Sequence, residues 1–241
     1  MILTLFKAEV LKVRNSLALL MMLACPLMVV LLNTGMLVKG KNFSAAAPQM
    51  WTYYWIGSVA IWCYFMLPLY IALVTALVNG NEHRNHTWRL MLTLPITQRQ
   101  LYLAKLMVIV CMVIGANVGL MAGLMLVHGS FALAGHPLEP ALSYPVGWTM
   151  LKMIAASLPV VIVQHTVSWR SPNFFLAVAV GVCATMGMVS IGSSDSWVYF
   201  PWSYIVMATN GGDASLQATA LNLALMVGLP LLALSSYWLG K

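Results

Sequence analysis

Six long apolar stretches divide this chain, and each is long enough to cross a lipid bilayer. A helical span needs about 20 consecutive apolar residues, because the hydrocarbon core offers the backbone no hydrogen-bond partner. The chain is also 61% hydrophobic and only 7% charged, whereas a soluble domain is about 25% charged. We therefore expect an all-α integral membrane protein whose residues 1–241 form a single transmembrane domain. The predicted spans are residues 16–38, 51–78, 101–127, 144–167, 173–191 and 217–239.

Lysine and arginine residues fall mainly on one side of these spans. The other side has only Lys39 and Lys41. Cytoplasmic loops are enriched in Lys and Arg, so we expect both termini of this multi-pass chain in the cytoplasm. The nine residues on the cytoplasmic side are Lys7, Lys12, Arg14, Arg84, Arg89, Arg99, Lys105, Arg170 and Lys241.

Lys152 belongs to neither side, because it lies inside the fourth predicted span. A lysine at that depth either lines a polar conduit or extends its side chain to water at the outer end of the helix. The sequence leaves both interpretations open.

Residues 1–14 have the pattern of an amphipathic helix. The three-four spacing of one apolar face fits Ile2, Leu3, Phe6, Val10 and Val13. Basic side chains lie away from that face, as in helices that lie in the headgroup region of a membrane and bind anionic lipid. We expect an N-terminal interfacial helix with Glu9, Lys12 and Arg14 as its candidate functional residues.

The only long polar and basic segment, residues 82–105, follows the second span. Residues 86–94 can form two helical turns, which Pro95 ends because proline cannot continue the backbone hydrogen bonding. Thr97 is a good N-cap, and Gln100 three residues later completes a capping box. The third helix is therefore expected to begin below the bilayer. The alternative is an ordinary basic loop that follows the positive-inside rule.

An aromatic-rich segment, residues 195–210, separates the fifth and sixth spans and contains no Lys or Arg. Pro201 would interrupt a helix there, and the stretch after it is too short to cross a bilayer. We expect a re-entrant element at the outer leaflet, which is tolerated only where protein covers its backbone. The alternative is an aromatic belt at the membrane surface.

Most motifs of enzymes and metal proteins are absent from the sequence. Residues 35–42 come near the phosphate-binding GxxxxGK[ST] pattern, but Asn42 replaces the hydroxyl that binds magnesium. His83 and His86 have no further ligand nearby, so no metal site is expected. The chain is therefore predicted to bind no cofactor by itself and not to be an enzyme.

Small residues inside the spans indicate packing. Gly115, Gly119 and Gly123 form a GxxxGxxxG pattern, which favours close contact between helices. The four cysteines lie in separate apolar stretches and are expected to be buried as small hydrophobic side chains. They are Cys25, Cys63, Cys111 and Cys183.

Three sequence segments give the chain a resemblance to ABC type-2 permeases over essentially its whole length. They are KAEVLKVRNS before the first span, EHRNHTWRLMLTLPITQRQLYLAKL after the second, and FPWSY before the last. The chain is most similar to the lantibiotic-immunity and bacitracin-resistance permeases, which implies the inner membrane of a bacterial cell. One departure is that its outer connections are short, so substrate capture is expected within the membrane or at its surface.

This resemblance implies partners and roles for particular residues. The permease would pair with an identical or homologous second permease and with two copies of an ABC ATPase, which would bind ATP and Mg. The segment after the second span would be the coupling helix that contacts the ATPase, and the aromatic segment would cap the exit. The coupling residues are Glu82, Arg84, Thr87, Trp88, Leu92 and Pro95, and those of the exit cap are Pro201, Trp202 and Tyr204.

We expect the permease subunit of an ATP-driven exporter that moves an amphipathic peptide antibiotic, or a similar membrane-active compound, outward. Its other partner is membrane lipid, and no nucleic acid is expected. A second hypothesis is a membrane-embedded enzyme or assembly factor acting on lipid-linked intermediates. It needs an acid or a pair of histidines facing the bundle interior, and no span shows one. A coupling segment also argues against a channel without an energy source.

Overall fold

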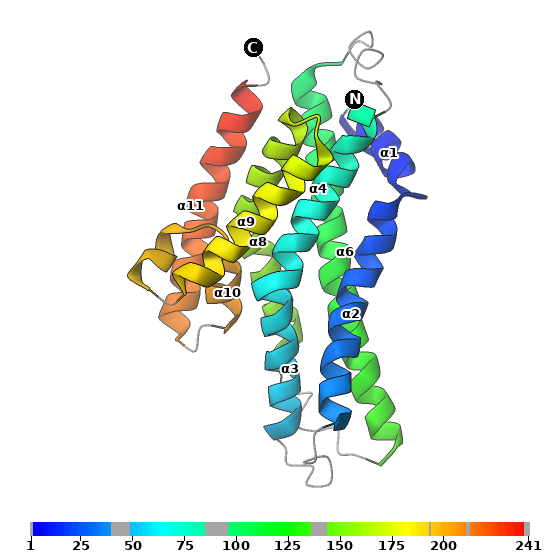
Figure 1. Cartoon of the computed structure of the whole chain (residues 1–241), viewed down its shortest axis with the longest axis vertical. Coiled ribbons are helices and arrows are strands. Elements are labelled where there is room, and N and C mark those ends of the chain that lie inside the picture. The colour runs from blue at the N-terminus through cyan, green and yellow to red at the C-terminus, as the bar shows by residue number, and fades with distance from the viewer. Residues whose placement is uncertain are drawn as a thin grey trace.

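The computed structural model of the chain is a bundle of long helices, and none of the described residues forms a strand (Figure 1). The structure describes residues 2–39, 49–84, 96–135, 144–192, 194–210 and 213–238. In chain order the elements are α1 (Ile2–Val13), α2 (Leu17–Lys39), α3 (Gln49–Ile61), the π-helical turn η2 (Trp62–Met66), α4 (Leu67–Arg84), α6 (Gln98–Leu133), α8 (Val146–Arg170), α9 (Phe174–Ile191), the 3₁₀ turn η3 (Asp195–Tyr199), α10 (Ser203–Asn210) and α11 (Ala214–Trp238).

Six of these helical stretches are long and apolar enough to cross a membrane, in agreement with the predicted number of spans. Among them α6 is the longest, with 36 residues, or about 54 Å at 1.5 Å per residue. The hydrocarbon core is only about 30 Å thick, so α6 extends beyond it. The six stretches are Leu17–Lys39, Trp51–Gly80, Gln98–Leu133, Val146–Arg170, Phe174–Ile191 and Ala214–Tyr237.

Helix α6 begins with the predicted capping box. The Thr97 hydroxyl accepts a hydrogen bond from the backbone N–H of Gln100 at 3.2 Å, and the Gln100 side chain accepts one from the Thr97 N–H at 3.1 Å. Two backbone donors that the first turn leaves unpaired are satisfied in this way. The cap fixes where α6 starts, three residues before the predicted span.

The second span contains a π turn, which the sequence pattern did not predict. Its extra residue rotates the following side chains, and such turns often occur at functional sites. Trp62, the first residue of η2, donates from Nε1 to Oδ1 of Asn117 at 2.9 Å. In α4, which follows this turn, Tyr70 donates to the carbonyl of Met112 at 3.2 Å. The second span is thus bonded to α6 at two depths.

The glycine stripe of α6 allows α2 to approach closely, as predicted. A methyl group added at Gly115 or Gly123 would come within 3.0 Å of a side chain of α2, and at Gly119 it would only touch one. Close packing of this kind holds membrane helices together, because apolar side chains gain little from leaving lipid for protein. The facing residues of α2 are Met22, Pro26 and Val30.

The cysteines correct part of the sequence prediction. Cys63 is buried and Cys25 is half-buried, but Cys111 and Cys183 are exposed. The prediction of burial is wrong for those two, because a membrane helix carries apolar residues on its lipid-facing side as well. Apolar neighbours therefore do not indicate burial within the protein. All four thiols are free.

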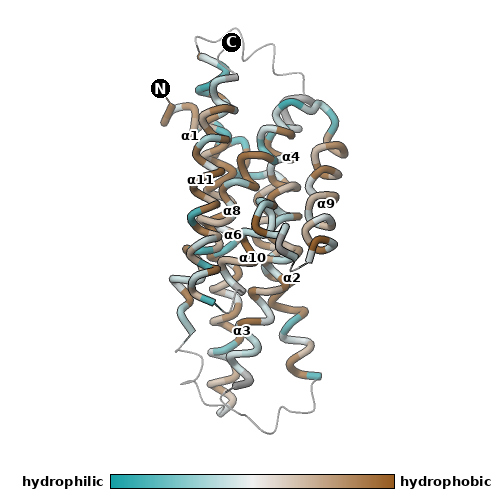
Figure 2. The backbone as a smooth tube through the Cα atoms, turned by 90° about the vertical axis from the view of Figure 1, so that its left-hand side faces the viewer, coloured by the Kyte–Doolittle hydropathy of each residue, from teal (hydrophilic) through white to brown (hydrophobic). Residues whose placement is uncertain are grey.

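The helices divide into a central and a peripheral set. The second span, α6 and α8 bury half or more of their most apolar stretch, whereas α2, α9 and α11 expose most of theirs. Figure 2 shows that the peripheral helices are nevertheless largely apolar. Exposed leucines such as Leu20, Leu23 and Leu31 of α2 would favour aggregation in water, whereas contact with lipid suits them.

The two ends of the bundle differ in charge. Helix α1 lies at the end where α4 and α8 finish, α6 begins and α11 finishes (Figure 1). We call this end of the bundle the basic end, because most of the described lysine and arginine side chains lie there. They are Lys7, Lys12, Arg14, Arg99, Lys105 and Arg170. The opposite end is held by aromatic contacts between α3 and α6, such as Trp51 against His128 with ring centroids 4.0 Å apart.

Candidate functional site

Four helices meet in a buried polar cluster at the basic end of the bundle. We call this cluster the polar junction; it consists of Glu9 of α1, Asn79 of α4, Tyr102 and Lys105 of α6, and His165 and Ser168 of α8. All six side chains are buried. Burying polar and charged groups is costly unless each finds a partner, so their pairing decides what the junction can do.

An ion pair ties α1 to α6. Glu9 Oε2 lies 2.9 Å from Nζ of Lys105, and its Oε1 lies 2.5 Å from Nζ of Lys12. The Glu9 and Lys105 side chains are only 3% and 1% exposed. The same Lys105 ammonium donates to the backbone carbonyl of Val78 at 3.3 Å. One lysine of α6 therefore binds both α1 and α4.

The Glu9 carboxylate is held in its charged form. Burial raises the pKa of this carboxyl, but the positive charges and hydrogen bonds of Lys105 and Lys12 outweigh burial, and the pKa lies below the usual 4.5. At neutral pH the carboxylate neutralises a lysine that is buried more deeply than itself. The ion pair is therefore present at neutral pH.

A hydrogen-bonded chain ties α4 to α6 and α8. Asn79 Nδ2 donates to Nδ1 of His165 at 3.0 Å and to Oγ of Ser168 at 2.6 Å. His165 Nε2 lies 3.2 Å from the Tyr102 carbonyl. A carbonyl can only accept, so Nε2 carries a proton, and the Asn79 N–H can only donate, so Nδ1 carries none. With the Asn79 amide in this orientation the imidazole is the neutral Nε2 tautomer. Both ring nitrogens of His165 are thus used in binding other helices.

Ring contacts complete the junction between α6 and α8. The rings of Tyr102 and His165 lie 4.4 Å apart, and Trp169 meets Tyr102 edge-on at 5.4 Å. The Tyr102 hydroxyl is 2.9 Å from Oγ1 of Thr166. Aromatic contacts of this geometry stabilise a pair beyond the area that they bury. The start of α6 and the end of α8 are thereby fixed to each other.

The junction contains a buried acid and a buried histidine, which the sequence analysis had not placed in the bundle interior. An enzyme would need such groups to face a substrate. Here both Glu9 oxygens bind lysines, both His165 nitrogens bind other helices, and neither residue lines either of the two cavities described below. The described residues also contain no group of three or more metal-ligating side chains. The arrangement joins helices and offers no open catalytic face.

The family of the chain follows from comparison with known proteins. A family model described as ABC-2 family transporter protein matches residues 5–189. The chain belongs to the ABC-2 transporter family. The matched region runs from α1 through most of α9 and includes the whole polar junction. No curated protein and no solved structure matches the chain.

Membership has direct consequences for the role of this permease. It is a multi-pass membrane protein and the membrane component of a transport system, and the family implies partnership with an ABC ATPase. The expected coupling residues Thr87, Trp88, Leu92 and Pro95 lie outside the described residues. The helix α4 reaches Glu82 and Arg84, but their side chains also lie outside the described part. Their roles stay predictions.

The N-terminal helix of the permease exists as predicted, but its inward face does not consist of apolar residues alone. Glu9 and Val13 are its buried residues. Leu3 and Leu11 are 69% and 67% exposed, so an apolar edge remains outside. Arg14 follows the helix and is exposed. That α1 lies in the membrane interface stays a prediction.

Lys152 of α8 is buried and binds another helix. Its Nζ donates to Oε1 of Gln217 in the first turn of α11, at 2.9 Å. The contact joins α8 to α11 near the end opposite the polar junction. The contact is compatible with both predicted roles of Lys152, a residue that lines a conduit and a side chain that extends to water.

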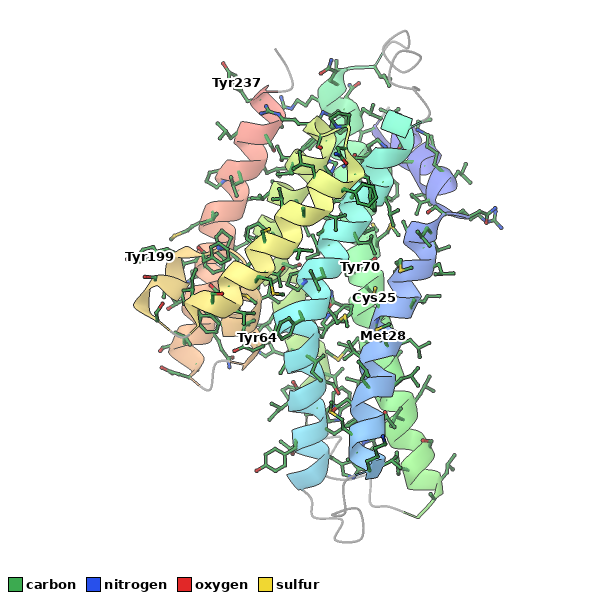
Figure 3. All side chains as sticks on the ribbon, in the orientation of Figure 1. Cys25, Met28, Tyr64, Tyr70, Tyr199 and Tyr237 are labelled. Carbon is green, nitrogen blue, oxygen red and sulfur yellow. The ribbon has the colours of Figure 1, made fainter. Side chains whose placement is uncertain are left out.

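The aromatic segment packs against the bundle through its second half. Trp202 and Tyr204 are 6% and 2% exposed, whereas Tyr199 is 84% exposed and projects from the outer edge of the molecule (Figure 3). Pro201 lies in the turn between η3 and α10. Ser203 donates to the carbonyls of Trp197 and Phe200, at 2.5 Å and 2.6 Å, which holds this turn closed. Helix α10 is enclosed by α3, α8 and α11.

Of the residues that build the polar junction, sequence reasoning indicated only Glu9 as a functional residue, and it placed Glu9 on an interfacial helix rather than in a buried cluster. It counted Lys105 only as a topology signal and gave no role to Asn79 or His165. The available signal was their chemistry, because a charged or amide side chain inside an otherwise apolar helix usually faces the protein and has a partner. The sequence could not identify those partners, since Glu9 and Lys105 are 96 residues apart.

The ion pair makes a testable prediction about stability. Glu9→Gln should lower the free energy of unfolding by about 3–5 kcal/mol, because it leaves the buried Lys105 ammonium without its carboxylate. Lys105→Met should cost less, because Glu9 keeps its ion pair with Lys12. The double variant should be less destabilised than the sum of the two. Thermal unfolding of the purified permease would measure this, with the exposed Lys7→Met of the same helix as a control near zero. Additive losses would show that Glu9 and Lys105 do not interact.

The same pair predicts the direction of a pH effect. The folded-state pKa of Glu9 is lowered, so its contribution to stability is complete above the unfolded pKa of about 4.3 and is lost as pH falls through the folded value. On acidification below about pH 4.3, the stability difference between wild type and Glu9→Gln should therefore shrink.

Proposed function

We propose that this chain is the permease subunit of an ATP-driven exporter in the bacterial inner membrane, within the lantibiotic-immunity and bacitracin-resistance branch of the family. It would move an amphipathic peptide antibiotic, or a similar membrane-active compound, outward. A second permease, identical or homologous, and two ATPase copies would complete the transporter. One observation carries the proposal: the polar junction ties together the helices on both sides of the expected coupling segment.

The junction supports a direct path for mechanical coupling. The coupling segment, residues 82–97, joins the end of α4 to the start of α6. Lys105 of α6 binds the Val78 carbonyl of α4 and the Glu9 carboxylate of α1, and Asn79 of α4 binds His165 of α8. A displacement of the segment by the ATPase would therefore move α1, α4, α6 and α8 as one body. Peripheral helices with fewer buried contacts would then change their packing against it.

The buried half of the aromatic segment supports an exit cap. A short helix broken from its neighbour by Pro201 and enclosed by α3, α8 and α11 satisfies the requirement that a non-spanning element be covered by protein. In this proposal α10 closes the outer side of the conduit, with Trp202 and Tyr204 as its packed aromatic contacts. The exposed Tyr199 would then have no part in closure.

The coupling proposal predicts the behaviour of two variants. Trp88 and Leu92 are four residues apart, so on a helix they share one face. Losing a large aromatic anchor costs about 2 kcal/mol or more, so Trp88→Ala should release the ATPase in a pull-down. Glu82→Ala should keep the complex but uncouple ATP hydrolysis from transport. Trp148→Ala is the matched control, because Trp148 is 56% exposed at the opposite end of the bundle. Wild-type ATPase recovery with Trp88→Ala would exclude this segment as the docking site.

The export proposal and the exit cap can be tested in one growth assay. A susceptible host that expresses the permease with its ATPase should gain resistance to a lantibiotic or to bacitracin. Trp202→Ala should abolish most of this resistance, because it removes a buried contact of the cap, while the ATPase stays bound. Tyr199→Ala, an exposed aromatic of the same segment, should keep it. Wild-type resistance in both variants would mean that the segment is an aromatic belt at the membrane surface and not a cap. Absence of resistance with the wild-type permease would refute the proposed substrate class.

Topology gives an independent test of the cytoplasmic assignment. Cysteines introduced as Ser44→Cys and Ser215→Cys, in a background without native cysteines, should react with a membrane-impermeant maleimide from outside intact cells. Asn85→Cys should react only after the membrane is opened, because it lies in the basic segment expected in the cytoplasm. Labelling at position 85 in intact cells would contradict this orientation.

A further inference from the structure

Two adjoining cavities lie along the surface where α8 meets α11. The first, of about 440 Å³, lies between α6, α8 and α11 and has Ile2 of α1 in its wall. The second, of about 350 Å³, lies between α8 and α11 nearer the basic end. Ile162 lines both, so the two cavities adjoin each other. We call them together the α8–α11 groove.

The wall of this groove is apolar along nearly its whole length. It is lined mainly by leucine, isoleucine and valine side chains. The two hydroxyls in the second cavity donate to carbonyls of their own helices, Thr166 to Ile162 at 2.7 Å and Ser235 to Leu232 at 3.1 Å. Their donors are therefore used, and the groove favours an aliphatic chain over a polar ligand.

A positive charge stands where the groove reaches the basic end. Arg170 is the last residue of α8, lines the second cavity and is exposed. No described acidic side chain forms an ion pair with it. A guanidinium binds phosphate through two parallel N–H donors. The groove thus combines an apolar channel with an anion-binding group at its mouth.

The length of the groove matches one leaflet of a bilayer. From Leu158 to Arg170 it follows 13 residues of α8, and the two ends are about 18 Å apart along the helix. Half of a hydrocarbon core is about 15 Å deep. A lipid with its phosphate at Arg170 would therefore lay its acyl chain along the groove to the level of Leu158.

We propose that the α8–α11 groove binds a phospholipid with an anionic headgroup, one acyl chain lying in the two cavities and the phosphate on Arg170. The volume of the two cavities suits an acyl chain. A helix from a second copy is about 10–12 Å wide and does not fit between α8 and α11. These two helices are in close contact, because a methyl group added at Gly228 of α11 would lie 3.6 Å from the ring of Pro159 of α8. The proposal does not depend on the ATPase or on the exported compound.

Two native cysteines provide a matched pair of probes. Cys111 lines the first cavity and is exposed, and Cys183 is exposed on α9 outside both cavities. After Cys25→Ala and Cys63→Ala, one is replaced by Ala and the other labelled with a bimane fluorophore. The full chain is then placed in nanodiscs of phosphatidylglycerol and phosphatidylcholine. The ratio of the two lipids is the same in every sample. In one sample the phosphatidylglycerol carries bromine in its acyl chains, and in the other the phosphatidylcholine does.

The expected result is selective quenching at Cys111. Brominated phosphatidylglycerol should quench the fluorophore at Cys111 about five times more than its fraction in the bilayer predicts. One basic side chain near a membrane surface attracts an anionic lipid by about 1 kcal/mol, which corresponds to this ratio. Arg170→Gln should remove the preference, and the exposed Arg99→Gln should keep it. At Cys183 both lipids should quench in proportion to their amounts. Native mass spectrometry of the unlabelled permease should show one phosphatidylglycerol retained by wild type and lost in Arg170→Gln.

Two results would overturn the proposal. Quenching at Cys111 in simple proportion to the lipid mixture, without a retained phosphatidylglycerol, would mean that only bulk lipid meets the groove. Absence of quenching by either lipid at Cys111, with normal quenching at Cys183 and no retained lipid, would mean that a second protein copy covers the groove.

Discussion

The basic end of this permease depends on one interaction, the ion pair of the buried Lys105 ammonium with the Glu9 carboxylate. An isolated charge at 1% exposure would be prohibitive in a protein interior, so Lys105 requires the Glu9 carboxylate. That requirement brings α1 against α6, although much of the apolar surface of α1 faces outward. The same ammonium also reaches the Val78 carbonyl. The position of α1 and the spacing of α4 from α6 therefore follow from neutralising one charge.

The remaining contacts between helices follow from the solvent that surrounds them. Lipid is as apolar as leucine, so hydrophobic burial contributes little to helix association, and close packing and hydrogen bonds must supply it. The glycine stripe of α6 provides the first. Long-range bonds such as Trp62 to Asn117 and Asn79 to His165 provide the second. The glycine contacts join α6 to α2, and the hydrogen bonds join the second span to α6 and α8. Helix α6 takes part in both kinds of contact.

Helix α1 connects the two sites described here. Glu9 belongs to the polar junction, while Ile2 forms part of the wall of the α8–α11 groove. The groove also runs along α6 from Leu103 to Cys111. An acyl chain bound in the groove would therefore contact α1 and α6, and α6 directly follows the expected coupling segment. The physical link is short, because it passes through one helix of 12 residues.

The sequence alone determined the six spans, the N-terminal helix and the capping box at Thr97. Each depends on local composition or on residues three or four apart, and such signals do not need the rest of the chain. Tertiary structure alone decided the partners of Glu9, Asn79 and His165, the exposure of Cys111 and Cys183, and the π turn at Trp62. A lipid-facing surface is as apolar as a buried one, so composition cannot tell which side of a span faces protein. Pairing across 96 residues, as between Glu9 and Lys105, is fixed only when the helices pack.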